Sequence, residues 1–150
     1  MRSREIALVF ARLALAAGFL SAVVDRLGIW GPYGTVNVAW GDMEHFLSYT
    51  ARLNPWFPTS FIPFVGWVAT IAEVVLGILL LVGWKTRPAA LASGFLMMAF
   101  AAGMSAGPGT KTALNASVFA AAAATFVLAG ADRYALSVDA VRSAGAKNSK

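Results

Sequence analysis

Hydrophobic residues in this chain fall in long, nearly uncharged blocks separated by short polar or aromatic segments. Such blocks differ from the alternating or one-sided patterns of soluble strands and helices, and about 20 apolar residues are what a helix needs to cross about 30 Å of hydrocarbon. Four blocks have this length: residues 6–28, 61–83, 88–106 and 113–131. The pattern predicts an all-α polytopic membrane protein, a four-transmembrane-helix bundle over residues 1–131. A polar tail over residues 132–150 is predicted to begin as a short surface helix and to be disordered from residue 145.

The first connection, residues 29–60, is unusually long and rich in aromatic residues. Connections of this length in compact proteins are usually functional or contain structure of their own. Asp42 can cap a helix that continues to about Leu53, with apolar residues at helical spacing on one face, and Asn54-Pro55 would end it. We expect an interfacial helix in this first external loop, lying over the bundle with its tryptophans at headgroup level.

Two further patterns predict how the helices pack. Residues 84–88 form a tight turn in which Thr86 can cap the next helix and Pro88 suits its first turn. The second and third spans are therefore predicted to be antiparallel neighbours. Small residues recur every four positions in three spans, a spacing that lets helix backbones approach closely. These residues are Ala14, Gly18, Ala22, Ala99, Gly103, Gly107, Ala116, Ala120 and Ala124.

Composition and charge support the membrane interpretation. The chain is 59% hydrophobic and only 13% charged, with a mean hydropathy of +0.69, whereas soluble domains are about 25% charged. The net charge of +5 does not indicate nucleic acid, because the basic residues flank the apolar blocks along the whole chain. One side of the membrane would hold Arg2, Arg4, Lys85, Arg87, Arg133, Arg142, Lys147 and Lys150. Only Arg26, Arg52 and Lys111 fall on the other, so the positive-inside rule predicts that both termini are cytoplasmic.

The inventory of reactive side chains excludes several kinds of chemistry. Without cysteine the chain itself has no thiolate nucleophile, disulfide exchange, iron–sulfur ligation or cysteine zinc site. Its single histidine cannot build a bis-histidine haem, and no metal-ligand cluster or nucleotide-binding motif is present. Any redox chemistry must therefore use a diffusible cofactor or a partner subunit.

Glu73 is the only charged residue of the second span and lies near its middle. A carboxylate at bilayer depth is costly, so it normally faces the protein interior, has a partner and marks a site. Counted from the cytoplasmic helix ends, Arg12 lies about 9 Å deep and Glu73 about 15 Å deep, within reach of an arginine side chain. The predicted Arg12–Glu73 pair is either a buried ion pair that fixes helix register or a polar anchor for a ligand in an apolar pocket. Without a partner, Glu73 would be neutral and suited to proton exchange.

The candidate ligand-binding residues are Glu73, Arg12, Arg26, Trp67 and His45. Seven-residue spacing places Arg26 on nearly the same helix face as Arg12, toward the bundle, while Asp25 points toward the aromatic loop. Ordinary interfacial charge is the simpler alternative for both. Trp67 is an aromatic residue of the same span as Glu73. His45 has no second ligand at helical spacing, which favours a hydrogen-bonding role over metal binding.

Several short motifs resemble those of the DoxX-like family of small bacterial membrane proteins. They are EVVLG at 73–77, LLLVG at 79–83, TRPAA at 86–90, FARL at 10–13 and NASVF at 115–119. The resemblance covers nearly the whole chain and implies a multi-pass protein of the bacterial inner membrane, in a family named after subunits of quinone-linked oxidation of sulfur compounds. Residues 22–26 depart from the Gly-x-x-Lys-like helix ending of many members.

Two functions follow as hypotheses. The first is a quinone-interacting or redox-linked membrane subunit, which would belong to a quinone-linked oxidoreductase and bind a quinone non-covalently beside a partner subunit. The alternative is a non-catalytic binding or assembly factor that uses its small-residue faces or its loop in the lipid bilayer. A transporter or channel is disfavoured, because the sequence has neither an evident inverted repeat nor a ring of polar residues. Homo-oligomerisation stays open.

Overall fold

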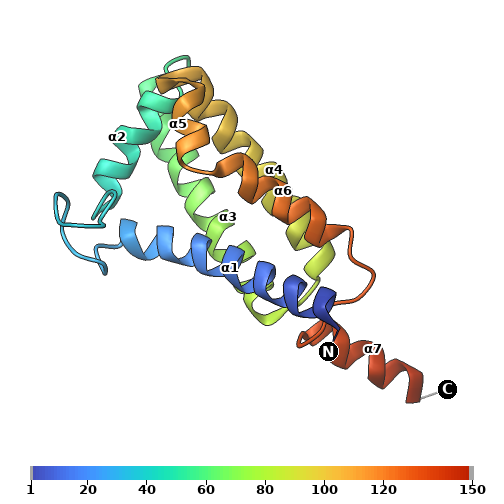
Figure 1. Cartoon of the computed structure of the whole chain (residues 1–150). Helices are drawn as coiled ribbons and strands as arrows, with labels where there is room; N and C mark the ends of the chain where they lie inside the picture. The colour runs from blue at the N-terminus through green and yellow to red at the C-terminus, as the bar shows by residue number, and fades with distance from the viewer. Residues whose placement is uncertain (1, 149–150) are drawn as a thin grey trace.

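The computed structural model describes residues 2–148, and over that range the chain forms helices and turns without a strand. The helices are α1 (Ser3–Arg26), α2 (Met43–Leu53), α3 (Ile62–Val82), α4 (Thr86–Met104), α5 (Thr110–Asn115), α6 (Val118–Ala129) and α7 (Val138–Asn148) (Figure 1). A short 3₁₀ turn, η1 (Thr59–Phe61), precedes α3, and a π-helical turn, η2 (Ser105–Gly109), joins α4 to α5.

Three helical segments are long and apolar enough to cross a membrane: Ser3–Arg26, Thr59–Val82 and Thr86–Asn115. The all-helical class is confirmed over the described residues, and these segments are compatible with a helical membrane protein. The fourth predicted span, residues 113–131, is wrong as a continuous helix. Ser117 adopts a φ of 54°, which a right-handed helix cannot contain, so α6 has only 12 residues. The residues before this break form α5 instead, which continues from α4 through the π-helical turn.

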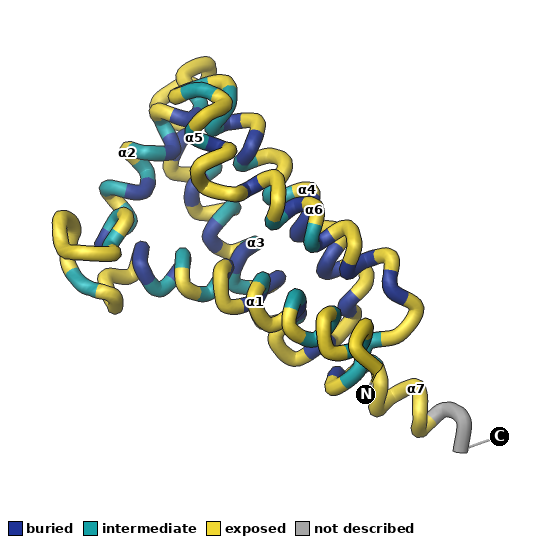
Figure 2. Tube along the Cα trace, in the orientation of Figure 1, coloured by how far each residue is buried: buried dark blue, intermediate teal, exposed yellow. Residues whose placement is uncertain are grey.

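The start of α1 and helix α7 lie at one end of the molecule, and α2 lies with α5 at the opposite end (Figure 1). We call these the terminal end and the loop end. Helix α1 packs along α3, α4 packs along α6, and α3 and α4 are antiparallel neighbours as predicted. Their buried faces meet in one apolar core: Ala16, Phe19, Leu76, Leu80, Ala89, Ala90, Leu128 and Ala129. The outward faces of the long helices are largely exposed (Figure 2), as expected of helices that contact lipid.

The predicted loop helix is confirmed as α2. The side chain of Asp42 accepts the backbone N–H of His45 at 2.8 Å, which caps the helix, and α2 ends at Leu53 before Asn54. Its apolar face packs against α3, where Gly66 leaves room for Phe46 and Leu47. The helix therefore covers the loop end of α3.

The small-residue stripes pack as predicted only in part. In the stripe of the third span, Gly103 and Gly107 let the end of α2 approach closely at Arg52 and Leu53, as predicted. Nothing lies within 4 Å of a side-chain position at Gly18, and Ala116 and Ala120 are exposed, so the stripes of α1 and α6 do not form helix contacts. The close approach between α4 and α6 uses Gly94 instead, which lies under the ring of Phe126. Small residues permit close packing of helices, but they do not specify which helix packs against them.

The tail folds back on the terminal end. Helix α7 confirms the predicted surface helix and continues to Asn148, so the disorder predicted from residue 145 is wrong for residues 145–148, and residues 149–150 lie outside the described range. The carboxylate of Asp139 accepts the backbone N–H groups of Lys85 and Thr86 at 2.9 and 2.8 Å. Asp139, and not Thr86 as predicted, thus caps α4 from a position more than 50 residues away.

Asp139→Asn is expected to destabilise the protein by about 1 kcal/mol at neutral pH, because the carboxylate satisfies two N–H groups at a helix N-terminus. Burial by itself would raise the pKa of Asp139. The hydrogen bonds from Thr86 and Lys85 outweigh this effect, so the pKa of Asp139 lies below its ordinary value. The stabilisation should therefore be full above the ordinary aspartate pKa of about 3.9 and be lost as the pH falls through the lowered value.

Thermal unfolding of detergent-solubilised protein between pH 3 and 7 measures this effect. Asp132→Asn removes an exposed carboxylate from the same tail and is the matched control. Equal melting temperatures for the two variants at pH 7 would contradict the capping role.

Candidate functional site

A cluster of buried polar side chains lies where α1, α2 and α3 meet. The guanidinium of Arg26, at the end of α1, forms an ion pair with Glu73 of α3 and donates a 2.9 Å hydrogen bond to Thr70 Oγ1. The side chains of Arg26 and Glu73 are only 2% and 3% exposed. The hydroxyl of Thr70 in turn donates a 2.8 Å hydrogen bond to the backbone oxygen of Gly66. The pair is therefore closed off from solvent and fully inside the protein.

The first connection covers this cluster. The guanidinium carbon of Arg26 lies 3.7 Å from the ring centre of Phe46 and 5.1 Å from that of Trp40, in cation–π geometry. Asp25 Oδ2 accepts the backbone N–H of Trp40 at 2.9 Å. Two consecutive residues of α1 thus hold the loop, one by its charge over aromatic rings and the other by a hydrogen bond.

Of the two interpretations of Arg26 and Asp25, the structure agrees with the inward-facing one and not with the simpler, favoured one of interfacial charge. Arg26 faces the bundle under the loop helix, and Asp25 faces the aromatic loop. The alternative of ordinary interfacial charge is wrong, because the two residues are only 3% and 4% exposed. Buried charges are retained in folded proteins only when they are paired or hydrogen-bonded.

The predicted Arg12–Glu73 pair is wrong. Arg12 is buried at the terminal end, where its Nη2 donates to the backbone oxygen of Leu136 at 2.6 Å and its guanidinium lies against Gly83. The predicted depths assumed that the first two spans end at the same height on the cytoplasmic side. In the structure, Arg12 lies beside Gly83, at the end of α3. Helix α1 therefore extends beyond α3 by about nine residues, or about 14 Å. That shift brings Arg26 to the depth of Glu73.

Trp67 does not join the cluster. It lies six residues before Glu73, which is about 240° around the helix, and it is 48% exposed on the outer face of α3. Its exposure makes it a lipid-facing residue and removes it from the candidate site around Glu73.

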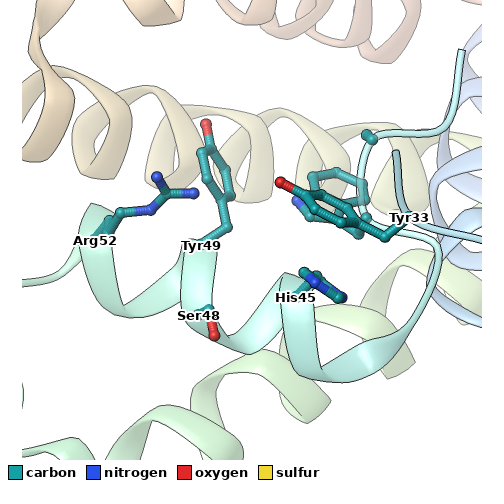
Figure 3. A pocket seen from close by; sticks show the side chains of 7 residues that line it. Tyr33, His45, Ser48, Tyr49 and Arg52 are labelled. Atoms are coloured by element: carbon teal, nitrogen blue, oxygen red, sulfur yellow. The ribbon is translucent and has the colours of Figure 1, made fainter. Parts of the chain in front are cut away.

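His45 lies in a separate cavity, the loop pocket, of about 390 Å³. The lining residues are Tyr33, Ala39, Trp40, His45, Ser48, Tyr49 and Arg52 (Figure 3). The His45 ring stacks on Tyr33 at 3.8 Å between ring centres, and its Nδ1 lies 2.9 Å from both carboxylate oxygens of Asp42. The expected hydrogen-bonding role of His45 is confirmed.

Electrostatics in the loop pocket follow from these contacts. The backbone N–H of His45, and then its ring, lower the pKa of Asp42 by hydrogen bonding to the carboxylate. Burial raises the pKa of Tyr49, although Arg52 lies over its ring at 5.6 Å and opposes the shift. The pocket therefore offers a guanidinium and hydroxyl groups as donors, beside aromatic faces.

The family description named methylamine utilisation protein MauE matches residues 4–129. The chain belongs to the MauE family. The resemblance to DoxX-like proteins is thereby corrected, because this match covers the same motifs and no DoxX match accompanies it. No curated protein and no solved structure matched the chain.

The structure explains why the motifs misled. Gly83 has a φ of 70°, and a side chain there would collide with Arg12 and Ser137, so glycine is required for the turn into α4. Gly77 lies against Phe19 and Leu20 of α1. Gly83 therefore serves the turn into α4 and Gly77 the contact with α1, and such packing roles do not by themselves identify a family.

Chemically, this MauE-family chain offers hydrogen bonding and charge but few reactive groups. Residues 2–148 contain no group of three His, Asp or Glu side chains that could hold a metal ion. Trp40 and Thr70 belong to the cluster around Glu73 and were missed by sequence reasoning. Thr70 precedes Glu73 by three residues and so shares its helix face, a signal that was available. The membership of Trp40 in this cluster could not be predicted, because a loop residue lies in no periodic pattern that would indicate its position.

Proposed function

We propose that this MauE-family chain is a non-catalytic membrane accessory factor that assists the maturation of a methylamine dehydrogenase, with redox chemistry supplied by a partner. One observation carries most of the weight. The chain has no cysteine, and its buried carboxylate Glu73 is closed in an ion pair beneath the loop helix. A group so enclosed holds the loop in place and cannot reach a substrate, so the fold serves as a scaffold.

The proposed orientation puts the loop end outside the bacterial inner membrane and both termini in the cytoplasm. The terminal end carries most of the basic residues, whereas the loop end adds only Arg26, Arg52 and Lys111. Arg26 is neutralised by Glu73. An exported enzyme would then meet the loop end, where Trp30, Tyr33 and Trp56 are more than half exposed. Exposed aromatic residues of this kind are enriched at protein interfaces and at membrane surfaces.

Deletion of the gene for this chain from its host tests the proposal. Active methylamine dehydrogenase should fall to near background while its polypeptides are still made, and the gene supplied in trans should restore it. Affinity purification of the tagged chain in mild detergent should then recover a stoichiometric partner that contains cysteine or another redox group. Normal amounts of active enzyme in the deletion strain would contradict a role in maturation.

Quinone binding is the second candidate, favoured by the loop pocket. A quinone ring could stack on its aromatic walls, and its two carbonyl oxygens could accept hydrogen bonds from Arg52 and Tyr49. Solvent extraction of the same purified protein measures bound quinone directly. Quinone that is retained by the unaltered chain and lost from Arg52→Gln would support this candidate, and a quinone-free chain with normal maturation activity would exclude it.

A further inference from the structure

A second cavity of about 560 Å³ lies between the loop-end half of α1 and the first connection, and we call it the α1 groove. Its lining includes Gly18, Ala22 and Asp25 of α1 and Trp30, Asn37 and Trp40 of the first connection. Ala39 and Trp40 line both this groove and the loop pocket. Gly18 has no neighbour within 4 Å, so this part of α1 is open.

The carboxylate of Asp25 is the unusual feature of the α1 groove. The residue is 4% exposed; Oδ2 accepts the N–H of Trp40, while Oδ1 is buried without a hydrogen-bond partner. A buried carboxylate oxygen that lacks a hydrogen-bond donor costs free energy. Oδ1 is therefore the oxygen of this carboxylate that still lacks a hydrogen-bond donor.

The charge of the missing donor follows from the neighbouring residues. The buried cluster contains two carboxylates, Asp25 and Glu73, and one cation, Arg26. The guanidinium of Arg26 is paired with Glu73 and bonded to Thr70, so it does not compensate Asp25. A cation at Asp25 would make the cluster electrically neutral, which a low-dielectric environment strongly favours.

The walls of the groove indicate an organic cation. The indole N–H of Trp30 donates to Ser21, at 3.2 Å from both its Oγ and its backbone oxygen, which fixes the ring beside the groove. Indole is the best aromatic partner for a cation, and aromatic side chains are typical of sites that recognise ammonium ligands. The small residues Gly18 and Ala22 leave space for an alkyl group in this part of the groove.

We propose that the α1 groove binds a primary ammonium group, which donates a hydrogen bond to Asp25 Oδ1 while its carbon substituent lies against Trp30 and Trp40. Two sources carry this chemistry: a small free alkylamine and the ethanolamine headgroup of a phospholipid. The site is distinct from the Arg26–Glu73 pair and does not depend on the proposed maturation role.

Titration with methylammonium chloride tests the free-amine source. The full chain is held in dodecyl maltoside, which contains no ammonium group, and tryptophan fluorescence is followed at constant ionic strength maintained with sodium chloride. The unaltered chain should give a saturable change, and Asp25→Asn should weaken binding about ten-fold or more, as loss of one charge-assisted hydrogen bond implies. Glu44→Gln removes an exposed carboxylate from the same connection and should leave the titration unchanged.

Two further measurements complete the test. Asn at position 25 retains an oxygen for the N–H of Trp40, so circular dichroism should show an intact fold, and Ala22→Leu should block binding by filling the groove without altering any charge. Native mass spectrometry in mixed phosphatidylethanolamine and phosphatidylglycerol tests the lipid source. Preferential retention of phosphatidylethanolamine that Asp25→Asn abolishes would support the proposal. If neither methylammonium nor phosphatidylethanolamine binds, or if Asp25→Asn binds them equally well, the proposal is overturned.

Discussion

Glu73→Leu is expected to destabilise the folded protein by about 3–5 kcal/mol, because it leaves the guanidinium of Arg26 buried without a counter-charge. Replacing both partners should be far less harmful, since a buried ion pair exchanged for apolar side chains of similar volume is often neutral in stability. The double variant Arg26→Met/Glu73→Leu should therefore recover most of the loss. Thr70 keeps its hydrogen bond to Gly66 in both variants and introduces no new unsatisfied group.

Reversible unfolding in mixed detergent micelles, followed by circular dichroism, measures these differences. Glu44→Gln is the control for removal of an exposed carboxylate and should change stability by less than about 0.5 kcal/mol. If the single variant costs as little as this control, or if the double variant is less stable than the single one, the ion pair is not what holds α1 against α3.

Phe46→Ala is expected to cost about 3–5 kcal/mol, because Phe46 is 6% exposed and its removal leaves a cavity between α2 and α3. Its ring also lies over the guanidinium of Arg26, so the variant loses a desolvated cation–π contact. The loss should loosen α2 from the bundle and admit water to the buried cluster. Phe64→Ala removes the same side chain from an exposed position on α3 and should have little effect.

The absence of cysteine makes this opening measurable. Thr70 lies beneath α2 and is 4% exposed, so Thr70→Cys introduces a single buried thiol. A water-soluble maleimide should label this thiol slowly in the otherwise unaltered chain and much faster when Phe46→Ala is added. Equal labelling rates in the two backgrounds would show that Phe46 does not close the cluster.

The cluster illustrates how far sequence reasoning reached. The location of Glu73 in an uncharged stretch correctly indicated a buried, paired carboxylate. The identity of its partner was wrong, because Arg12 and Arg26 occupy nearly the same face of α1 and only the axial position of the helix distinguishes them. Contacts of α1 with Gly77 and Gly83 on α3 fix that position, and no count along a single helix contains this information.

The sequence by itself determined the three long helical segments, the membrane class and the loop helix with its Asp42 cap, because block length, periodicity and capping depend on residues close together in the chain. Only the tertiary structure decided the partner of Glu73, the capping of α4 by Asp139, the break at Ser117 and the unpartnered Asp25 Oδ1. These features depend on the axial position of each helix relative to its neighbours. Apolar helices in lipid have little hydrophobic preference for one register over another, so close packing and a few buried polar contacts set it.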